Sequence, residues 1–99
     1  MSSYYERIKT RISPDEIAAL TLKFVNIPSP TRQELEMSRY YAKTLQQLGL
    51  DVTLDYVEES RPNVIARLAG DGTGPGLMFC GHLDTVPAGN CVAPRIDQG

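Results

Sequence analysis

Polar and apolar residues alternate at helical spacing soon after the start of the chain. Ser13-Pro14 is typical of a helix N-terminus, because serine can cap the helix and proline suits its first position. We predict a helix that begins there and ends near Asn26, since Pro28 and Pro30 cannot continue it. The apolar positions of this helix share one face: Ile17, Leu20 and Phe24.

A second helix is predicted over residues 32–48. Residues 31–34 read Thr-Arg-Gln-Glu, the pattern of a capping box, and Gly49 is a suitable stop. Apolar and small residues follow at helical spacing: Leu35, Ser38, Ala42, Leu45 and Leu48.

Strands are predicted for the middle of the chain. Residues 51–57 alternate, a polar turn follows at 58–62, and residues 63–68 form the next strand. The short turn indicates an antiparallel pair. After a glycine-rich turn at 70–76, Leu77–Cys80 is apolar on both faces and predicts a central strand covered on both sides. The fold class is therefore α/β, with two helices followed by three strands.

Composition narrows the class of protein. The chain has 99 residues, 41% of them hydrophobic and 22% charged, which is ordinary for one globular domain or part of one. No stretch is apolar enough to span a membrane, and no run of Lys or Arg indicates a nucleic-acid partner. Residues 1–12 lack the apolar core of a secretory signal, so we expect a cytoplasmic protein with reduced cysteines. Residues 86–99 add no closing element, which indicates the first part of a larger domain.

Candidate chemistry is concentrated in Gly81–Pro87, at the end of the apolar run. His82 is the only histidine, and in an extended chain Asp84 points to the same side, with Cα atoms about 7 Å apart. The carboxylate could accept one imidazole N–H and leave the other nitrogen for a metal ion. Spacing alone leaves a structural or exposed histidine as an alternative. A metal site that includes Cys80, or a Cys91 nucleophile paired with His82, also remains open.

The Gly81–Pro87 stretch, Gly-His-Leu-Asp-Thr-Val-Pro, resembles the first metal-site motif of the M20 metallopeptidases and amidohydrolases. Residues 25–30, Glu34 and residues 63–68 fit the same family in order and spacing, so that the resemblance covers about residues 15–99. It implies that residues 1–99 are the N-terminal portion of a zinc-peptidase-like catalytic domain with a mixed sheet.

The resemblance also implies an activity. The complete enzyme would carry two Zn²⁺ ions, or Co²⁺, and would cleave amide bonds of small peptides or N-acyl amino acids. His82 would ligate one metal, and Asp84 would act in catalysis by holding the His82 ring. In the family, the other ligands and the dimerisation domain of a possible homodimer come later in the sequence than residues 1–99 reach. Glu58-Glu59 are not assigned to the family's glutamate pair, because they precede His82 and are in the wrong order. We therefore expect the 99-residue chain alone to be inactive.

The sequence does not identify the substrate. Many family members carry a tryptophan shortly after the Val-Pro, whereas this chain has none and reads Gly-Asn-Cys-Val at residues 89–92. Two other interpretations remain: a non-catalytic interaction module that pairs its open sheet with a partner, and a gene remnant without a function of its own.

Overall fold

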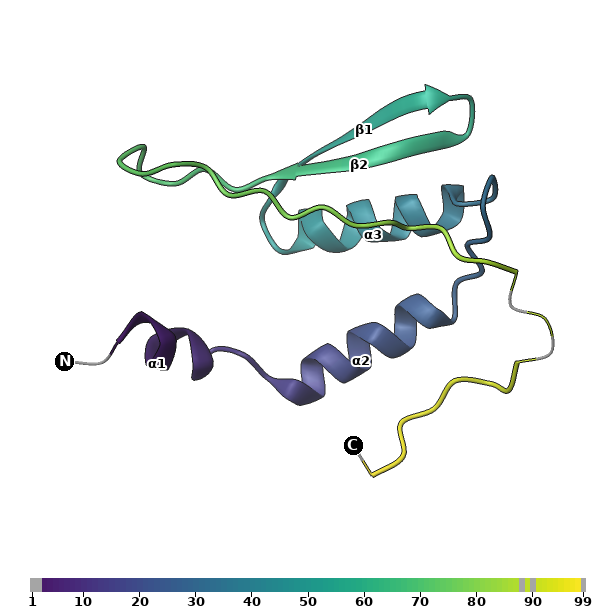
Figure 1. Ribbon diagram of the computed structural model, residues 1–99, viewed down its shortest axis with the longest axis horizontal. Coiled ribbons are helices and arrows are strands. Elements are labelled where there is room, and N and C mark those ends of the chain that lie inside the picture. Colours follow the sequence, from purple (N-terminus) through teal and green to yellow (C-terminus); the bar gives the residue numbers. More distant parts are fainter. Residues whose placement is uncertain (1–2, 88, 90, 99) are drawn as a thin grey trace. The chain divides into compact units, whose positions relative to one another are not determined.

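The computed structural model describes residues 3–87, 89 and 91–98. The chain forms two compact units, which we call the terminal unit (residues 1–26 and 92–99) and the hairpin unit (residues 27–91). The fold is α/β (Figure 1). Its elements are α1 (Tyr4–Lys9), α2 (Pro14–Val25), α3 (Leu35–Gln47), β1 (Asp51–Glu58) and β2 (Arg61–Arg67).

The terminal unit contains α1 and α2. The Ser13 hydroxyl accepts a hydrogen bond from the Glu16 N–H at 3.2 Å, Pro14 is the first helical residue, and α2 ends at Val25. These observations confirm the predicted helix and its cap. Helix α1 has only six residues, too few for a hydrophobic period to reveal it, and was not predicted. No helix in the described part of the chain is long and apolar enough to cross a membrane.

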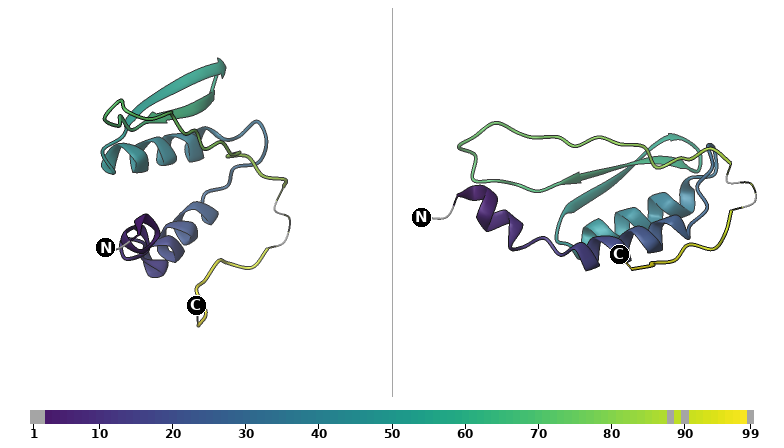
Figure 2. Two further views of the ribbon diagram at one scale, coloured as in Figure 1. Left: turned by 60° about the vertical axis from the view of Figure 1, so that its left-hand side comes forward. Right: turned by 60° about the horizontal axis from the view of Figure 1, so that its bottom comes forward.

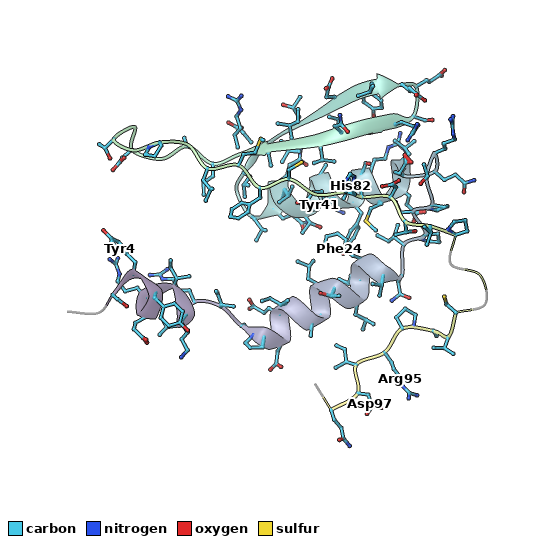
Figure 3. The ribbon with its side chains drawn as sticks, viewed as in Figure 1. Tyr4, Phe24, Tyr41, His82, Arg95 and Asp97 are labelled. Atoms are coloured by element: carbon cyan, nitrogen blue, oxygen red, sulfur yellow. The ribbon has the colours of Figure 1, made fainter. Side chains whose placement is uncertain are left out.

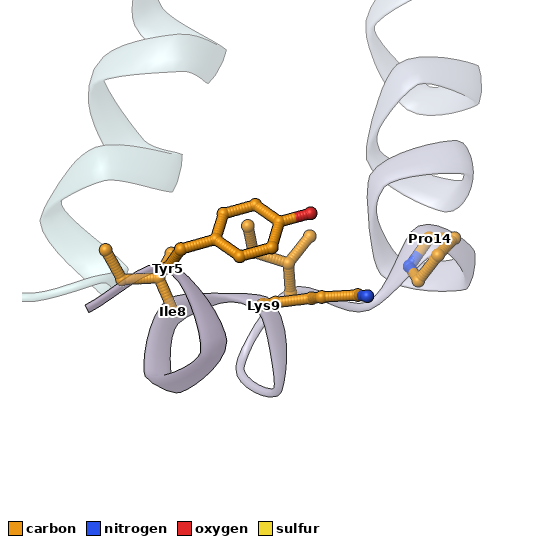
Figure 4. Close-up of a pocket in the computed structure, with 5 residues that line it drawn as sticks. Tyr5, Ile8, Lys9 and Pro14 are labelled. Carbon is orange, nitrogen blue, oxygen red and sulfur yellow. The ribbon is translucent and has the colours of Figure 1, made fainter. Parts of the chain in front are cut away.

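A small hollow of about 420 Å³ lies beside α1 and the start of α2 (Figure 4). It is lined by Tyr5, Ile8, Lys9, Ile12 and Pro14. The Lys9 ammonium lies 5.7 Å from the centre of the Tyr5 ring, a cation–π contact. Lys9 is thus the one charged residue among those that line the hollow, and its ammonium group already contacts the Tyr5 ring.

The hairpin unit consists of α3 packed against one face of the β1–β2 hairpin (Figure 2). The two strands are antiparallel, as predicted, with Val52 opposite Ala66 and Leu54 opposite Val64. These four side chains occupy every second position, so they share one face of the hairpin, and they are half-buried there. The residues next to them along each strand are exposed. The turn between the strands is tight, and Ser60 adopts φ 62° in it. β1 ends at Glu58 and β2 begins at Arg61, so both strands come closer to the turn than the sequence predicts.

The core of the hairpin unit is small. Helix α3 buries Met37, Ser38 and Ala42, and the Ser38 hydroxyl donates a 3.4 Å hydrogen bond to the Pro62 carbonyl of β2. Ser38 and Ala42 belong to the predicted stripe, whereas Leu48 is 68% exposed. Gly49 follows with φ 89°, the left-handed conformation expected of a glycine that stops a helix.

The predicted capping box at residues 31–34 is wrong. Helix α3 begins at Leu35 rather than near residue 32, and its N-cap Glu34 makes no side-chain capping bond. Arg32 has φ 79°, which turns the backbone out of the helical path just after Thr31. The Thr31 hydroxyl instead contacts a segment far along the sequence, described below.

The predicted third strand at Leu77–Cys80 and the mixed sheet are also wrong. The sheet of the described chain is a two-stranded antiparallel hairpin. Leu77, Met78 and Phe79 are extended but 81–90% exposed. A strand requires backbone hydrogen bonds to a neighbouring strand, and in the described chain residues 77–80 pair with neither β1 nor β2. The apolar pattern therefore indicates a segment suited to burial that these elements do not cover.

Candidate functional site

The Gly81–Pro87 stretch, which we call the motif segment, contains Asp84. It is fixed to the connector that precedes α3, residues 27–34. Pro30 and Thr85 form a parallel bridge between two segments more than fifty residues apart. The Thr85 N–H donates to the Ser29 carbonyl at 2.8 Å, and the Thr31 N–H donates to the Thr85 carbonyl at 3.2 Å. The connector is suited to this pairing because Pro28 and Pro30 hold the backbone extended.

Side chains reinforce the bridge. The hydroxyl of Ser29, a residue that is only 2% exposed, donates to the Leu83 carbonyl at 2.7 Å. The Thr85 hydroxyl lies 3.4 Å from the Ser29 carbonyl and can donate to it. The backbone on both sides of Asp84 is therefore anchored, and the motif leaves the connector in a defined direction.

The carboxylate of Asp84 is oriented by Thr31. The Thr31 hydroxyl donates to Asp84 Oδ2 at 2.7 Å. This hydrogen bond lowers the pKa of the Asp84 carboxyl below its usual value, and partial burial opposes the shift. The Asp84 backbone N–H and the Arg61 guanidinium lower the pKa of this carboxyl further. Asp84 is thus an ionised acceptor at neutral pH, as its predicted role requires.

A second carboxylate, Glu34, is paired with Arg61 of β2. Arg61 Nε lies 3.1 Å from Glu34 Oε2, and Nη2 lies 3.3 Å from Oε1. The Arg32 N–H also donates to Oε1. The hydrogen bond from Arg61 lowers the pKa of the buried Glu34 carboxyl, while desolvation acts in the opposite direction. The pair joins the start of α3 to the hairpin turn, where Arg61 also contacts Glu58 at 3.4 Å.

An open groove of about 1410 Å³ lies between residues 76–84 on one side and α3 with the hairpin on the other. Its lining includes Tyr41, Arg61, His82 and Asp84. Tyr41 projects from α3 and His82 from the motif segment (Figure 3). The His82 side chain is exposed. The structure therefore places both predicted site residues on the wall of one groove.

The described residues do not form a metal site by themselves. Within them, no group of three or more His, Cys, Asp or Glu side chains could hold a metal ion. The alternative Cys80–His82–Asp84 site is therefore not formed, and Cys80 is exposed. His82 remains as one nitrogen donor, which fits the chemistry of zinc. Zinc takes three or four protein ligands, so His82 fits as one member of a larger set.

Sequence reasoning did not identify Ser29, Thr31 or Arg61 as part of this site. The side chains of Ser29 and Thr31 alternate with the two prolines of the connector, a pattern that places polar groups on an extended backbone. That was the available signal. Arg61 is the first residue of β2, next to the hairpin turn, and its sequence neighbours give no sign of its pairing with Glu34.

Known proteins resemble this chain over most of its length. A protein named as a LysW-lysine/LysW-ornithine hydrolase, from Thermococcus kodakarensis, is 33% identical over 88 residues, which are 89% of this chain and 23% of that protein. The succinyl-diaminopimelate desuccinylase of Corynebacterium glutamicum is 34% identical over 80 residues, or 81% of this chain and 21% of the enzyme. That of Pelagibacter ubique is 36% identical over 75 residues, with shares of 72% and 19%.

The chain spans about a fifth of the length of these curated relatives. No family model matches it, and no solved structure matches it. The relatives are hydrolases by name, and the match includes most of the 99 residues. Over most of its length, the chain is thus a homologue of hydrolases of the M20 family.

Proposed function

We propose that this chain is the N-terminal portion of the catalytic domain of a metal-dependent hydrolase that cleaves an amide bond in an N-acyl amino acid or small peptide. The observation that carries the proposal is the bridge between Pro30 and Thr85, which fixes the motif segment on the groove wall. The homologous enzymes, named as a desuccinylase and as hydrolases of lysine or ornithine conjugates, support the reaction class. We assign the protein to the cytoplasm, as a homodimer in its full length.

His82 would ligate one of two metal ions, Zn²⁺ or Co²⁺, through one imidazole nitrogen. Asp84 would accept a hydrogen bond from the other ring nitrogen, which fixes the tautomer and orients the ring. A bound zinc ion supplies Lewis acidity and lowers the pKa of its water toward ~7. The remaining ligands would come from sequence outside these 99 residues. We therefore expect the isolated chain to bind metal weakly and to catalyse no hydrolysis.

The test compares matched aspartates in the full-length protein. Asp84→Asn should reduce Zn²⁺-dependent hydrolysis of N-succinyl and N-acetyl amino acids by roughly 10–100-fold, the usual cost of losing a partner of a metal-bound histidine. Asp71→Asn is the control, because Asp71 also accepts a threonine hydrogen bond, from the Thr73 hydroxyl at 2.6 Å, in an exposed turn. His82→Ala should abolish activity. Wild-type turnover in His82→Ala would refute the proposal.

One observation favours a second candidate, a non-catalytic interaction module. The apolar side chains of Leu77, Met78 and Phe79 are exposed together, and such patches mark surfaces that a partner covers. The mass of the native polypeptide that contains Gly81–Pro87 separates the two. A mass several times 10.9 kDa supports the hydrolase, whereas a mass near 10.9 kDa supports the module.

A further inference from the structure

Thr31 contacts the metal motif through both its backbone and its side chain. Its N–H donates to the Thr85 carbonyl at 3.2 Å, and its hydroxyl donates to Asp84 Oδ2 at 2.7 Å. The next bond of the bridge, from the Thr85 N–H to the Ser29 carbonyl, fixes the connector on the other side. Backbone pairing therefore places Thr31 beside Asp84, and two short side chains complete the contact.

The hydrogen bond between Thr31 and Asp84 is suited to hold a carboxylate in one orientation. Bonds to an ionised acceptor are shorter and roughly twice as strong as bonds between neutral groups. A carboxylate has about four lone-pair positions, so the bond from Thr31 leaves acceptor capacity for an imidazole N–H. His82 lies two residues before Asp84 on the motif segment, and both residues line the same groove.

The Thr31 hydroxyl has no competing structural role in the helix that follows. Helix α3 begins at Leu35, and its N-cap is Glu34, without a side-chain capping bond. Thr31 is exposed, so its side chain contributes little to packing. What distinguishes this side chain is its bond to Asp84, fifty-three residues away.

We propose that Thr31 is a positioning residue of the metal site: its hydroxyl orients the Asp84 carboxylate toward the His82 ring and so selects the tautomer that presents a nitrogen to the metal ion. This role rests on the proposed function, because it assigns His82 as a ligand. Thr31 itself touches neither metal nor substrate. Its effect is transmitted through Asp84 alone.

The test uses three variants of the full-length protein. Thr31→Val removes the hydroxyl and keeps the branched shape, whereas Thr31→Ser keeps the hydroxyl. Thr73→Val is the matched control, because it removes the other threonine hydroxyl that donates to an aspartate, Asp71. Thr31→Ala replaces Thr31→Val if the valine variant does not fold, and far-ultraviolet circular dichroism checks the fold of each variant.

The first readout is the tautomer of His82 in the metal-free protein, measured from its imidazole ¹⁵N shifts at about pH 8.5, roughly two units above the ordinary pKa of a histidine. The His82→Gln variant assigns the signal. We expect one dominant tautomer in the wild type, in Thr31→Ser and in Thr73→Val. Thr31→Val should give a mixture. The same mixture in all four proteins, or a single tautomer in all four, would overturn the role of Thr31.

The second readout is the affinity for Zn²⁺ alone, by calorimetry. Thr31→Val should weaken binding by roughly tenfold, the low end of the range for groups that support a metal-bound histidine. Thr31→Ser and Thr73→Val should bind as the wild type does, and equal affinity in Thr31→Val would contradict the proposal. If His82→Gln binds zinc as well as the wild type, the proposed function fails. The tautomer of the metal-free protein then still decides whether Thr31 orients Asp84 toward the ring.

Discussion

Replacing Ser29 with alanine tests how the motif segment is held in place. Ser29 is 2% exposed, and its hydroxyl donates to the Leu83 carbonyl at 2.7 Å. Alanine removes this donor without adding bulk, so the rest of the connector can stay in place. The Leu83 carbonyl then loses its partner, while the two backbone bonds of the bridge remain.

The expected magnitude follows from the type of bond. A hydrogen bond between two uncharged groups contributes about 0.5–1.5 kcal/mol net, because the unfolded groups bond to water instead. We therefore expect Ser29→Ala to lower the free energy of local opening by about 1 kcal/mol. Since 1.4 kcal/mol corresponds to a factor of ten, the segment should open roughly five times more often.

Amide hydrogen exchange measures this opening directly. The Thr85 N–H is bonded to the Ser29 carbonyl, so it exchanges when the bridge opens. Its exchange should be roughly fivefold faster in Ser29→Ala. Ser38→Ala is the control, because Ser38 is also fully buried and its hydroxyl also bonds to a backbone carbonyl, that of Pro62 in the hairpin. Wild-type exchange of Thr85 in a folded Ser29→Ala variant would refute this reasoning and leave the backbone bonds as the whole anchor.

Three further predictions concern single interactions. Ser13→Ala should destabilise α2 by about 1 kcal/mol through loss of its N-cap, visible as a weaker helical circular dichroism signal, and an unchanged signal would contradict it. Since pairing with Arg61 lowers the pKa of Glu34, this carboxylate stabilises the fold at neutral pH, and the contribution is lost as pH falls through the folded-state pKa. Urea unfolding should therefore show a weaker acid dependence in Glu34→Gln, and the same dependence in both proteins would rule out this origin. Gly49→Ala should lower the free energy of unfolding by about 1 kcal/mol because of its positive φ, whereas Gly70→Ala, equally open but without positive φ, should be near neutral in thermal unfolding.

The elements that the sequence predicts correctly depend on residues close together in the chain. Ser13 and Pro14 specify the start of α2 within a single helical turn. Alternation within β1 and a short turn specify the antiparallel hairpin. The run Leu77–Cys80 differs, because an apolar pattern indicates that a segment is suited to burial but not which element buries it. The sequence therefore predicts a strand at this run, but the described chain provides no neighbouring strand for it to pair with.

The sequence indicates which residues are candidates for the site, but not which residues hold them in place. His82 and Asp84 stand out through their types and spacing. The assignments of His82 as a ligand and of Asp84 as its partner stay predictions. The bond from Thr31 to Asp84 joins residues fifty-three positions apart, and no local pattern specifies a contact of that separation. The same threonine, followed by a glutamate three residues later, is also the usual signature of a helix cap.

Helix α3 begins later than predicted, and this late start leaves Thr31 available to the motif segment. A cap at Thr31 would place its hydroxyl on the first turn of the helix, and Glu34 would reach back toward it. Instead, Arg32 turns the backbone at φ 79°, and Glu34 holds this turn by accepting the Arg32 N–H while it pairs with Arg61. The delayed start of α3 leaves the polar groups of Thr31 outside the helix, where they bond to Thr85 and Asp84. The ion pair at the start of α3 therefore holds the turn that leaves Thr31 outside the helix, although neither of its charged groups makes a hydrogen bond to the Asp84 carboxylate in the described chain.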